Sequence, residues 1–266
     1  MNETEWQVPR FETVELRAKR SDYCICIPVL NEDGRIKAQL ERMRPFSEAV
    51  DIIMADGGST DGSMDQDFLR SQNVRTLLTL REPGRQGTQL RMAFAYALAQ
   101  GYEGILQVDG NNKDGVEAIP QFIDALRDGF EYVQGSRFIR GGEEINTPFI
   151  RHVAVRLLAS PIISVGAGRW YTDVTNGFRG YSRNYLSHPG VQPFRDVFVK
   201  YELILYLTVR ANQLGLTSKE IPVRRAYPSG KIPTKISFFS GNSNLLATIV
   251  KAALGFYNPR QKNAKR

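Results

Sequence analysis

A chain of 266 residues, of which 42% are hydrophobic and 24% charged, can bury a full core and is too apolar for extended disorder. Its formal net charge of +7 favours anionic partners, such as nucleic acid, acidic lipid or a phosphorylated substrate. The basic residues form no single block, and no zinc-finger, helix-turn-helix or aromatic nucleic-acid motif is present, so nucleic acid is the weakest of these.

Residues 1–20 are polar and charged, and we expect them to form an extension on or beside the domain. Strand-like and helix-like stretches then alternate. Apolar runs predict strands at 23–30, 51–55, 74–80, 104–108 and 132–134. Apolar residues spaced by three and four predict helices at 35–43, 64–71, 88–100 and 116–128. This alternation predicts an α/β fold with a mainly parallel sheet, whose ligands bind at the carboxyl ends of the strands.

The second half of the chain is less regular. Its patterns predict helices at 149–165 and 197–214 and strands at 178–181 and 217–223. The tail from 241 to 257 is apolar and helix-compatible, and basic residues follow it. It fits either an amphipathic helix on an anionic membrane surface or a last core helix with a solvated end.

Two features bear on the cellular setting. No signal-peptide pattern is present and no run approaches the roughly 18 apolar residues of a spanning helix, so we expect no membrane crossing. Cys24 and Cys26 share one face of a strand and lie too close for a favourable disulfide. We expect buried, reduced thiols and a cytoplasmic location, and two His with two Cys make a zinc site improbable.

Polar motifs follow the predicted strands at the expected binding edge. The first strand ends in Pro28-Val29-Leu30-Asn31-Glu32, and the second in Asp56-Gly57-Gly58-Ser59. Asp56 could accept hydrogen bonds from a base or ribose, although the segment is also good turn chemistry. Arg85 and Gln86, between two glycines at a helix start, could meet a diphosphate, and the spacing of a Walker loop is absent.

The fourth predicted strand is followed by Asp109-Gly110-Asn111-Asn112-Lys113-Asp114. Asp109 and Asn111 point the same way from an extended backbone, and their oxygens suit Mg²⁺ or Mn²⁺. An ordinary turn is the alternative.

The order of these motifs resembles the family-2 glycosyltransferases, and most closely their polyprenyl-phosphate branch, the dolichyl-phosphate mannose and glucose synthases. The resemblance covers nearly all of residues 23–236. It rests on the segments 28–32, 56–62, 84–87, 109–114, 135–138 and 172–179. It implies a single nucleotide-binding glycosyltransferase A-type, Rossmann-like domain at 21–236, with a helical, basic tail at 237–266.

The resemblance also implies roles for the donor side of the site. A divalent ion, Mg²⁺ or Mn²⁺, would be held on the donor diphosphate by Asp109 and the residue two positions along. That residue is the neutral Asn111 instead of a second Asp, so metal binding should be weaker; Lys113 could partly replace the metal, or Asp114 could become a ligand. The implied donor-binding residues are Pro28, Asn31, Glu32, Asp56, Gly57, Arg85, Gln86 and Lys113.

On the acceptor side, Arg137 in the family pattern faces the acceptor phosphate, which a guanidinium can grip through two oxygens. The alternative is a structural pair with Asp173 or Glu202. Asp173 would be the base for a sugar hydroxyl, whereas with an ionised lipid phosphate it would only orient its neighbours. The implied catalytic residues are Asp109, Asp173 and Arg137. The implied acceptor or phosphate residues are Ser136, Arg137, Arg140, Arg179, Arg225, Lys231 and Lys235.

The resulting hypothesis is an inverting glycosyltransferase that moves a hexose from a nucleotide-diphosphate sugar to a polyprenyl phosphate, in the cytoplasm or peripherally on the cytoplasmic membrane face. A saccharide acceptor in cell-surface polysaccharide assembly is the main alternative. A nucleotidyltransferase is a weaker alternative, since a Gly-rich basic loop after the first strand is missing. A non-catalytic nucleotide-sugar binder, with a metal site weakened by Asn111, is another weaker alternative.

Overall fold

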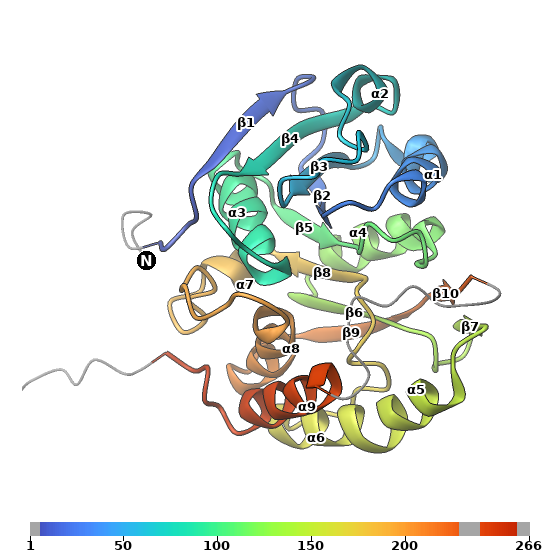
Figure 1. Ribbon diagram of the computed structural model, residues 1–266. Helices are drawn as coiled ribbons and strands as arrows, with labels where there is room; N and C mark the ends of the chain where they lie inside the picture. Colours follow the sequence, from blue (N-terminus) through green and yellow to red (C-terminus); the bar gives the residue numbers. More distant parts are fainter. Residues whose placement is uncertain (1–5, 229–239, 260–266) are drawn as a thin grey trace, which may run out of the picture.

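An eight-stranded sheet runs through the computed structural model, which describes residues 6–228 and 240–259 (Figure 1). Its strand order is β1-β4-β3-β2-β5-β8-β6-β9. The strands are β1 (Phe11–Glu15), β2 (Tyr23–Val29), β3 (Asp51–Asp56), β4 (Val74–Leu80), β5 (Gly104–Gln107), β6 (Tyr132–Ser136), β8 (Arg179–Ser182) and β9 (Ser218–Pro222). A separate parallel pair joins β7 (Glu143–Ile145) to β10 (Arg224–Ala226).

Helices cover both faces of this sheet. They are α1 (Gly34–Met43), α2 (Gln66–Ser71), α3 (Gln86–Ala99), α4 (Ile119–Arg127), α5 (Phe149–Ala154), α6 (Ser160–Ala167), α7 (Arg183–Ser187), α8 (Glu202–Gln213) and α9 (Ser240–Ala253). Short 3₁₀ turns lie at Arg44–Phe46 and Val116–Ala118, and a π-helical turn at Val155–Ala159 joins α5 to α6. The expected strands and helices of the first half are thus confirmed, with ends shifted by a few residues.

The burial of the central strands explains why apolar runs in the sequence predicted them. β2, β3 and β5 pair in parallel, and β3 is buried along its whole length, as expected for a strand covered on both faces. Alternate residues of β2 serve two cores: Cys24 and Cys26 face α3, whereas Ile25 and Ile27 face α1 and α4. Both cysteines are buried and free, as expected.

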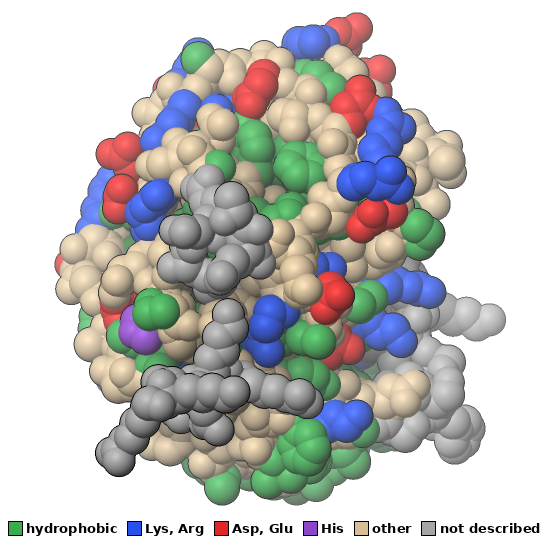
Figure 2. All heavy atoms as spheres, turned by 90° about the vertical axis from the view of Figure 1, so that its left-hand side faces the viewer, with side chains coloured by type: hydrophobic (Ala, Val, Ile, Leu, Met, Phe, Trp, Pro, Cys, Tyr) green, Lys and Arg blue, Asp and Glu red, His purple; other side chains and the backbone are tan. Residues whose placement is uncertain are grey.

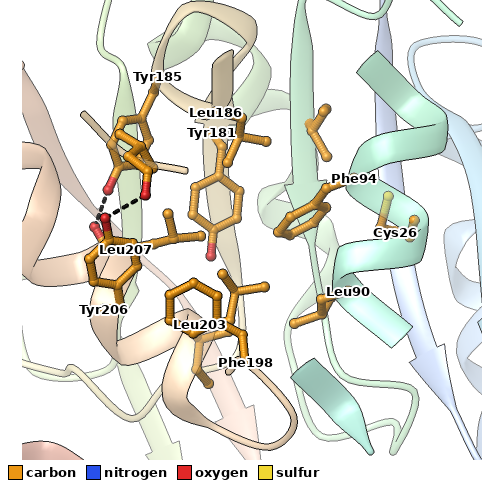
Figure 3. Packing of buried hydrophobic residues seen from close by; sticks show 14 of the residues in the cluster. Cys26, Leu90, Phe94, Tyr181, Tyr185, Leu186, Phe198, Leu203, Tyr206 and Leu207 are labelled. Carbon is orange, nitrogen blue, oxygen red and sulfur yellow. Dashed lines mark hydrogen bonds between the residues drawn. The ribbon is translucent and has the colours of Figure 1, made fainter. Parts of the chain in front are cut away.

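The core on the α3 side joins the two halves of the chain. Leu90 and Phe94 of α3 face Tyr181 of β8, and Leu203 of α8 packs behind them (Figure 3). The rings of Phe94 and Tyr181 have centroids 5.2 Å apart. This packing holds α3, including its first turn, against β8 and against the loop before β8.

Several elements differ from expectation. β1, from the N-terminal extension, pairs antiparallel with β4, and β8 lies antiparallel between β5 and β6. α8 begins at Glu202, five residues later than expected, because the chain before it packs on the start of α3. A Cβ on Gly87 would lie 2.7 Å from the carbonyl oxygen of Lys200, so this contact requires glycine.

A continuous helix corrects the expectation about membrane-spanning length. α5, the π turn and α6 form 19 residues, Phe149–Ala167, and within the described chain this is the one helix long and apolar enough to cross a membrane. Pro161 does not interrupt it, because Pro161 lies in the first turn of α6 and follows the π turn. One side of α6 packs on α8 and α9, as a core helix does.

α9 lies beside α6 at the lower end of the molecule (Figure 1). Ile249 and Ala252 are buried in the core, and a Cβ on Gly166 would come within 2.5 Å of the Ala253 Cα. Val250 of α9 and Leu254, which directly follows the helix, are exposed. α9 is therefore a core helix with a second, apolar and exposed side.

Candidate active site

The loops after β2 and β3 are tied together at the carboxyl edge of the sheet. The Asn31 side-chain oxygen accepts the Thr60 N–H at 2.8 Å, and the Asn31 N–H donates to the Ser59 hydroxyl at 3.0 Å. Both Asp56 oxygens accept the Ser59 N–H, at 2.9 and 3.2 Å. The buried Asp56 therefore holds its own turn, and Glu32 pairs with Arg35 at 2.9 Å.

Gln89 of α3, which the motif analysis did not assign, anchors this edge from behind. Its side-chain amide donates to the backbone oxygens of Val29 and Ala55, at 2.6 and 2.9 Å. A Cβ on Gly57 would lie 2.9 Å from that amide nitrogen. Gly57 thus allows α3 to approach the strand ends closely, next to Pro28.

Asp109 lies just past β5 and meets the start of α3. The Gln86 side-chain amide donates to Asp109 Oδ1 at 2.9 Å. The start of α3 and the end of β5, both expected near the donor, therefore lie in contact. Burial and the Asp109 charge raise the pKa of Tyr201, in the loop before α8, against the opposing charges of Arg151 and Arg85. The Asp109 side chain is 21% exposed, so it is the accessible carboxylate of this group.

Arg225 is the unexpected neighbour of Asp109. Its guanidinium lies 3.5 Å from Asp109 Oδ2 and forms a shorter ion pair with Asp114. A backbone bridge between Asp114 and Arg225 places the two side chains together. Burial raises the pKa of the Asp114 carboxyl despite the Arg225 charge, and the two carboxylates outweigh burial to raise the pKa of Arg225.

Three cations surround the buried ring of Tyr227. Lys113 Nζ lies 5.1 Å from the ring centroid, and the guanidinium carbons of Arg151 and Arg225 lie 5.5 and 5.8 Å from it. Arg151 also donates to the Tyr227 hydroxyl at 3.0 Å. Burial would raise the pKa of Tyr227, but Arg225 and Arg151 outweigh it and the pKa is lowered. We call Lys113, Arg151 and Arg225 the cation cluster.

Two of the three members of the cation cluster were predicted from the sequence. Lys113 and Arg225 were both expected near phosphate, but on the donor and acceptor sides respectively. Arg151 carried no motif, because it belongs to a helix that reads as apolar. Tyr227 lies between the expected phosphate residues Arg225 and Lys231, and no sequence motif gave it a role.

The residues present do not suit a divalent ion well. Both Asp109 oxygens face protein donors, and the Asn111 side-chain oxygen accepts the Lys113 N–H at 3.2 Å. Asp114, expected as a possible replacement ligand, is fully buried on Arg225. In residues 6–228 and 240–259, no group of three or more His, Cys, Asp or Glu could hold a metal. One accessible carboxylate is a poor set for Mg²⁺ or Mn²⁺, which favour several oxygen ligands.

Arg137 and Asp173 form a buried pair behind this group. Arg137 donates to the carboxylate through Nε at 2.6 Å, Nη2 at 2.8 Å and its backbone N–H at 3.2 Å. Both side chains are at most 1% exposed. The structural pairing of Arg137 with Asp173 is therefore present, and the Asp173 carboxylate has no open face to a substrate hydroxyl.

The remaining expected acceptor residues lie apart. The Ser136 hydroxyl shares a hydrogen bond with Thr172, and Arg140 is exposed at the turn before β7. Arg179 is fully buried and donates to the backbone oxygens of Val174 and Asn176, so it positions their loop and cannot reach a phosphate. Lys231 and Lys235 lie outside the described residues.

Gly177 brings that loop against Asp109, and this contact gives a first prediction. A Cβ on Gly177 would lie 2.7 Å from the Asp109 carboxylate, so Gly177→Ala should displace it and lower the rate of sugar transfer about tenfold or more. Gly34→Ala is the matched control, because a Cβ there meets nothing within 4 Å. Equal rates for the two variants, measured with saturating donor, would contradict the close contact.

Comparison with curated proteins gives relatives of one kind. The chain is 26% identical over 200 residues to an undecaprenyl-phosphate mannosyltransferase of Micrococcus luteus, covering 74% of this chain and 80% of the relative. It is 24% identical to a polyprenol monophosphomannose synthase of Mycolicibacterium smegmatis, over 75% of each chain. A dolichyl-phosphate hexose transferase of Haloferax volcanii matches at 24%, over 88% of this chain and 94% of the relative. These relatives confirm the expected resemblance to the polyprenyl-phosphate glycosyltransferases.

Solved structures confirm the fold. A glucosyl-3-phosphoglycerate synthase from Mycobacterium tuberculosis, in complex with Mn²⁺, UDP-glucose and phosphoglyceric acid, superposes with a TM-score of 0.63 at 17% identity. The match covers 92% of this chain and 83% of that one. The A-type glycosyltransferase fold expected from the sequence is thereby confirmed. No family model matches the chain.

Proposed function

We propose that this chain is an inverting glycosyltransferase that transfers a hexose from a nucleotide-diphosphate sugar to a polyprenyl phosphate. The observation that carries the proposal is the position of Asp109, between Gln86 and the cation cluster, at the carboxyl edge of a glycosyltransferase A-type sheet. Relatives named for polyprenyl-phosphate acceptors support the acceptor class.

The state of Asp173 favours a phosphate acceptor over a saccharide. A sugar hydroxyl must lose a proton as it attacks, so it needs a base that can reach it, whereas a phosphate monoester is already ionised at neutral pH. Asp173 is buried and bound on both oxygens by Arg137. The phosphate oxygen would form a bond to the anomeric carbon while the bond to the donor diphosphate breaks. The nucleoside diphosphate leaves with the electron pair, and the configuration inverts.

A two-phase product assay tests this function. Radiolabelled UDP-glucose and GDP-mannose are incubated with the protein and membrane lipid extract, and label is followed into the organic phase. We expect one donor to give an acid-labile, organic-soluble product. Label found only in a water-soluble saccharide would instead support the alternative acceptor, and no turnover with any nucleotide sugar would contradict the transferase.

The acceptor's lipid also fits an apolar surface on α6 and α9. Pro161, Ile162 and Val165 of α6 line a shallow groove with Val250 of α9 and with Leu254, which directly follows α9. Figure 2 shows hydrophobic side chains gathered at this lower end of the molecule, where α6 and α9 lie in Figure 1. Exposed cations in the π turn before α6, just after α6 and on α9 suit anionic headgroups. They are Arg156, Arg169 and Lys251. We propose that the protein lies peripherally on the cytoplasmic face of the membrane by this surface.

Vesicle binding tests the surface. Val165 is 83% exposed, and Val165→Asp should lower co-sedimentation with phosphatidylglycerol vesicles about tenfold, because a charge replaces apolar contact with lipid. Val197→Asp is the matched control, since Val197 is also exposed but does not line the groove. Unchanged co-sedimentation of Val165→Asp would reject the surface.

A further inference from the structure

The cation cluster lies beside Asp109, the carboxylate that the resemblance assigns to the family's divalent ion. Arg225 contacts Asp109 directly, while Lys113 and Arg151 lie on the same tyrosine ring as Arg225. These three cations face two carboxylates, Asp109 and Asp114, so the group has one positive charge in excess. Arg137, also close to Tyr227, has its own counterion in Asp173.

The excess charge is costly without an anion. Burial lowers the pKa of Lys113, and the neighbouring Arg225 and Arg151 lower it further. A bound diphosphate would remove this repulsion. Because Arg225 is buried and Lys113 and Arg151 are half-buried, their attraction for an anion would also be stronger than that of surface lysines.

We infer that the cation cluster replaces the divalent ion and binds the donor diphosphate with the protein's own charges, an inference that rests on the proposed function. Two observations separate it from metal-dependent binding: the oxygens of Asp109 and Asn111 already accept protein hydrogen bonds, and Asp114 is fully buried. Arg225 thus lies 3.5 Å from Asp109 Oδ2, the carboxylate oxygen that does not accept the Gln86 hydrogen bond. The leaving nucleoside diphosphate would be stabilised by fixed guanidinium and ammonium groups.

Nucleotide binding without turnover tests the inference. Calorimetric titration of the full chain with UDP and GDP, in EDTA and then in MnCl₂, should give dissociation constants that agree within about threefold. Lys113→Gln should weaken binding about tenfold or more in both buffers, since one charged contact is lost. Lys113 is chosen because it is half-buried and carries no buried ion pair, so its replacement should leave the fold intact.

Two further variants sharpen the test. Lys37→Gln is the matched control, because Lys37 is also half-buried and lies 5.6 Å from an aromatic centroid, that of Phe68. It should bind nucleotide as the unmodified chain does. Asn111→Asp supplies the missing carboxylate, and Mn²⁺ should then strengthen binding about tenfold in this variant alone.

The outcomes distinguish a failure of this inference from a failure of the proposed function. Binding by the unmodified chain that Mn²⁺ strengthens tenfold or more would overturn the inference and leave the function standing. Farnesyl phosphate serves as a soluble probe of the acceptor. A Lys113→Gln protein that binds nucleotide normally but no longer binds farnesyl phosphate would also overturn the inference, because the cation cluster would then belong to the acceptor site. If neither nucleotide binds in either buffer, the proposed function fails, and the inference fails with it.

Discussion

Asp109→Ala should lower kcat for sugar transfer about a thousandfold while the protein remains folded. Asp109 is the accessible carboxylate at the end of β5, and it holds the Gln86 amide on one side and Arg225 on the other. Without it, Arg225 would be free to turn entirely toward Asp114. The groups that we propose to bind the donor diphosphate would then lose their alignment.

The matched control for this variant is Asp124→Ala. Asp124 lies on α4, is 69% exposed and pairs with Arg127 only at 3.8 Å, so its loss should leave transfer unchanged. Initial rates with both substrates saturating, together with a thermal melt of each variant, make the comparison. Near-normal turnover of Asp109→Ala would remove Asp109 from the site.

Asp173→Ala should lower the free energy of unfolding by about 3–5 kcal/mol, because it leaves the Arg137 guanidinium buried without a counterion. Chemical denaturation of the purified protein measures this directly. A variant that unfolds at the same denaturant concentration as the unmodified chain would show that burial of Arg137 does not depend on this carboxylate.

A double replacement separates the stability of the pair from its chemistry. Arg137→Met with Asp173→Leu removes both buried charges, so much of the lost stability should return. If the pair only supports the site, transfer should recover with the fold. If Arg137 binds the acceptor phosphate, the refolded double variant should show a raised KM for the lipid phosphate and an unchanged affinity for nucleotide.

Much of the first half of the fold could be predicted because its signals are local. Buried parallel strands read as apolar runs, and the polar residues after β2, β3 and β5 meet at one edge because parallel strands share a direction. This was enough to place Asp109 beside the start of α3. The second half was harder, because β8 runs antiparallel between two strands distant in sequence.

Pairings between distant side chains could not be read in this way. The motifs left open whether Arg137 met a phosphate or Asp173, and whether Asp114 was a metal ligand. Each alternative depends on which side chain lies within about 3 Å in the folded chain, and no short-range pattern records that distance. In the structure, Asp173 is bound to Arg137 and Asp114 is bound to Arg225.

The sequence by itself predicted the A-type sheet, and it placed the expected donor motifs at the carboxyl edge of that sheet, with one carboxylate instead of two in the expected metal motif. Only the tertiary structure decided what stands beside that motif. Arg225 is 116 residues from Asp109, and it arrives there because β10 pairs with β7 and its backbone bridges to Asp114. Local periodicity reports how a segment folds, whereas the charge balance of a site depends on segments that meet only when the chain is packed.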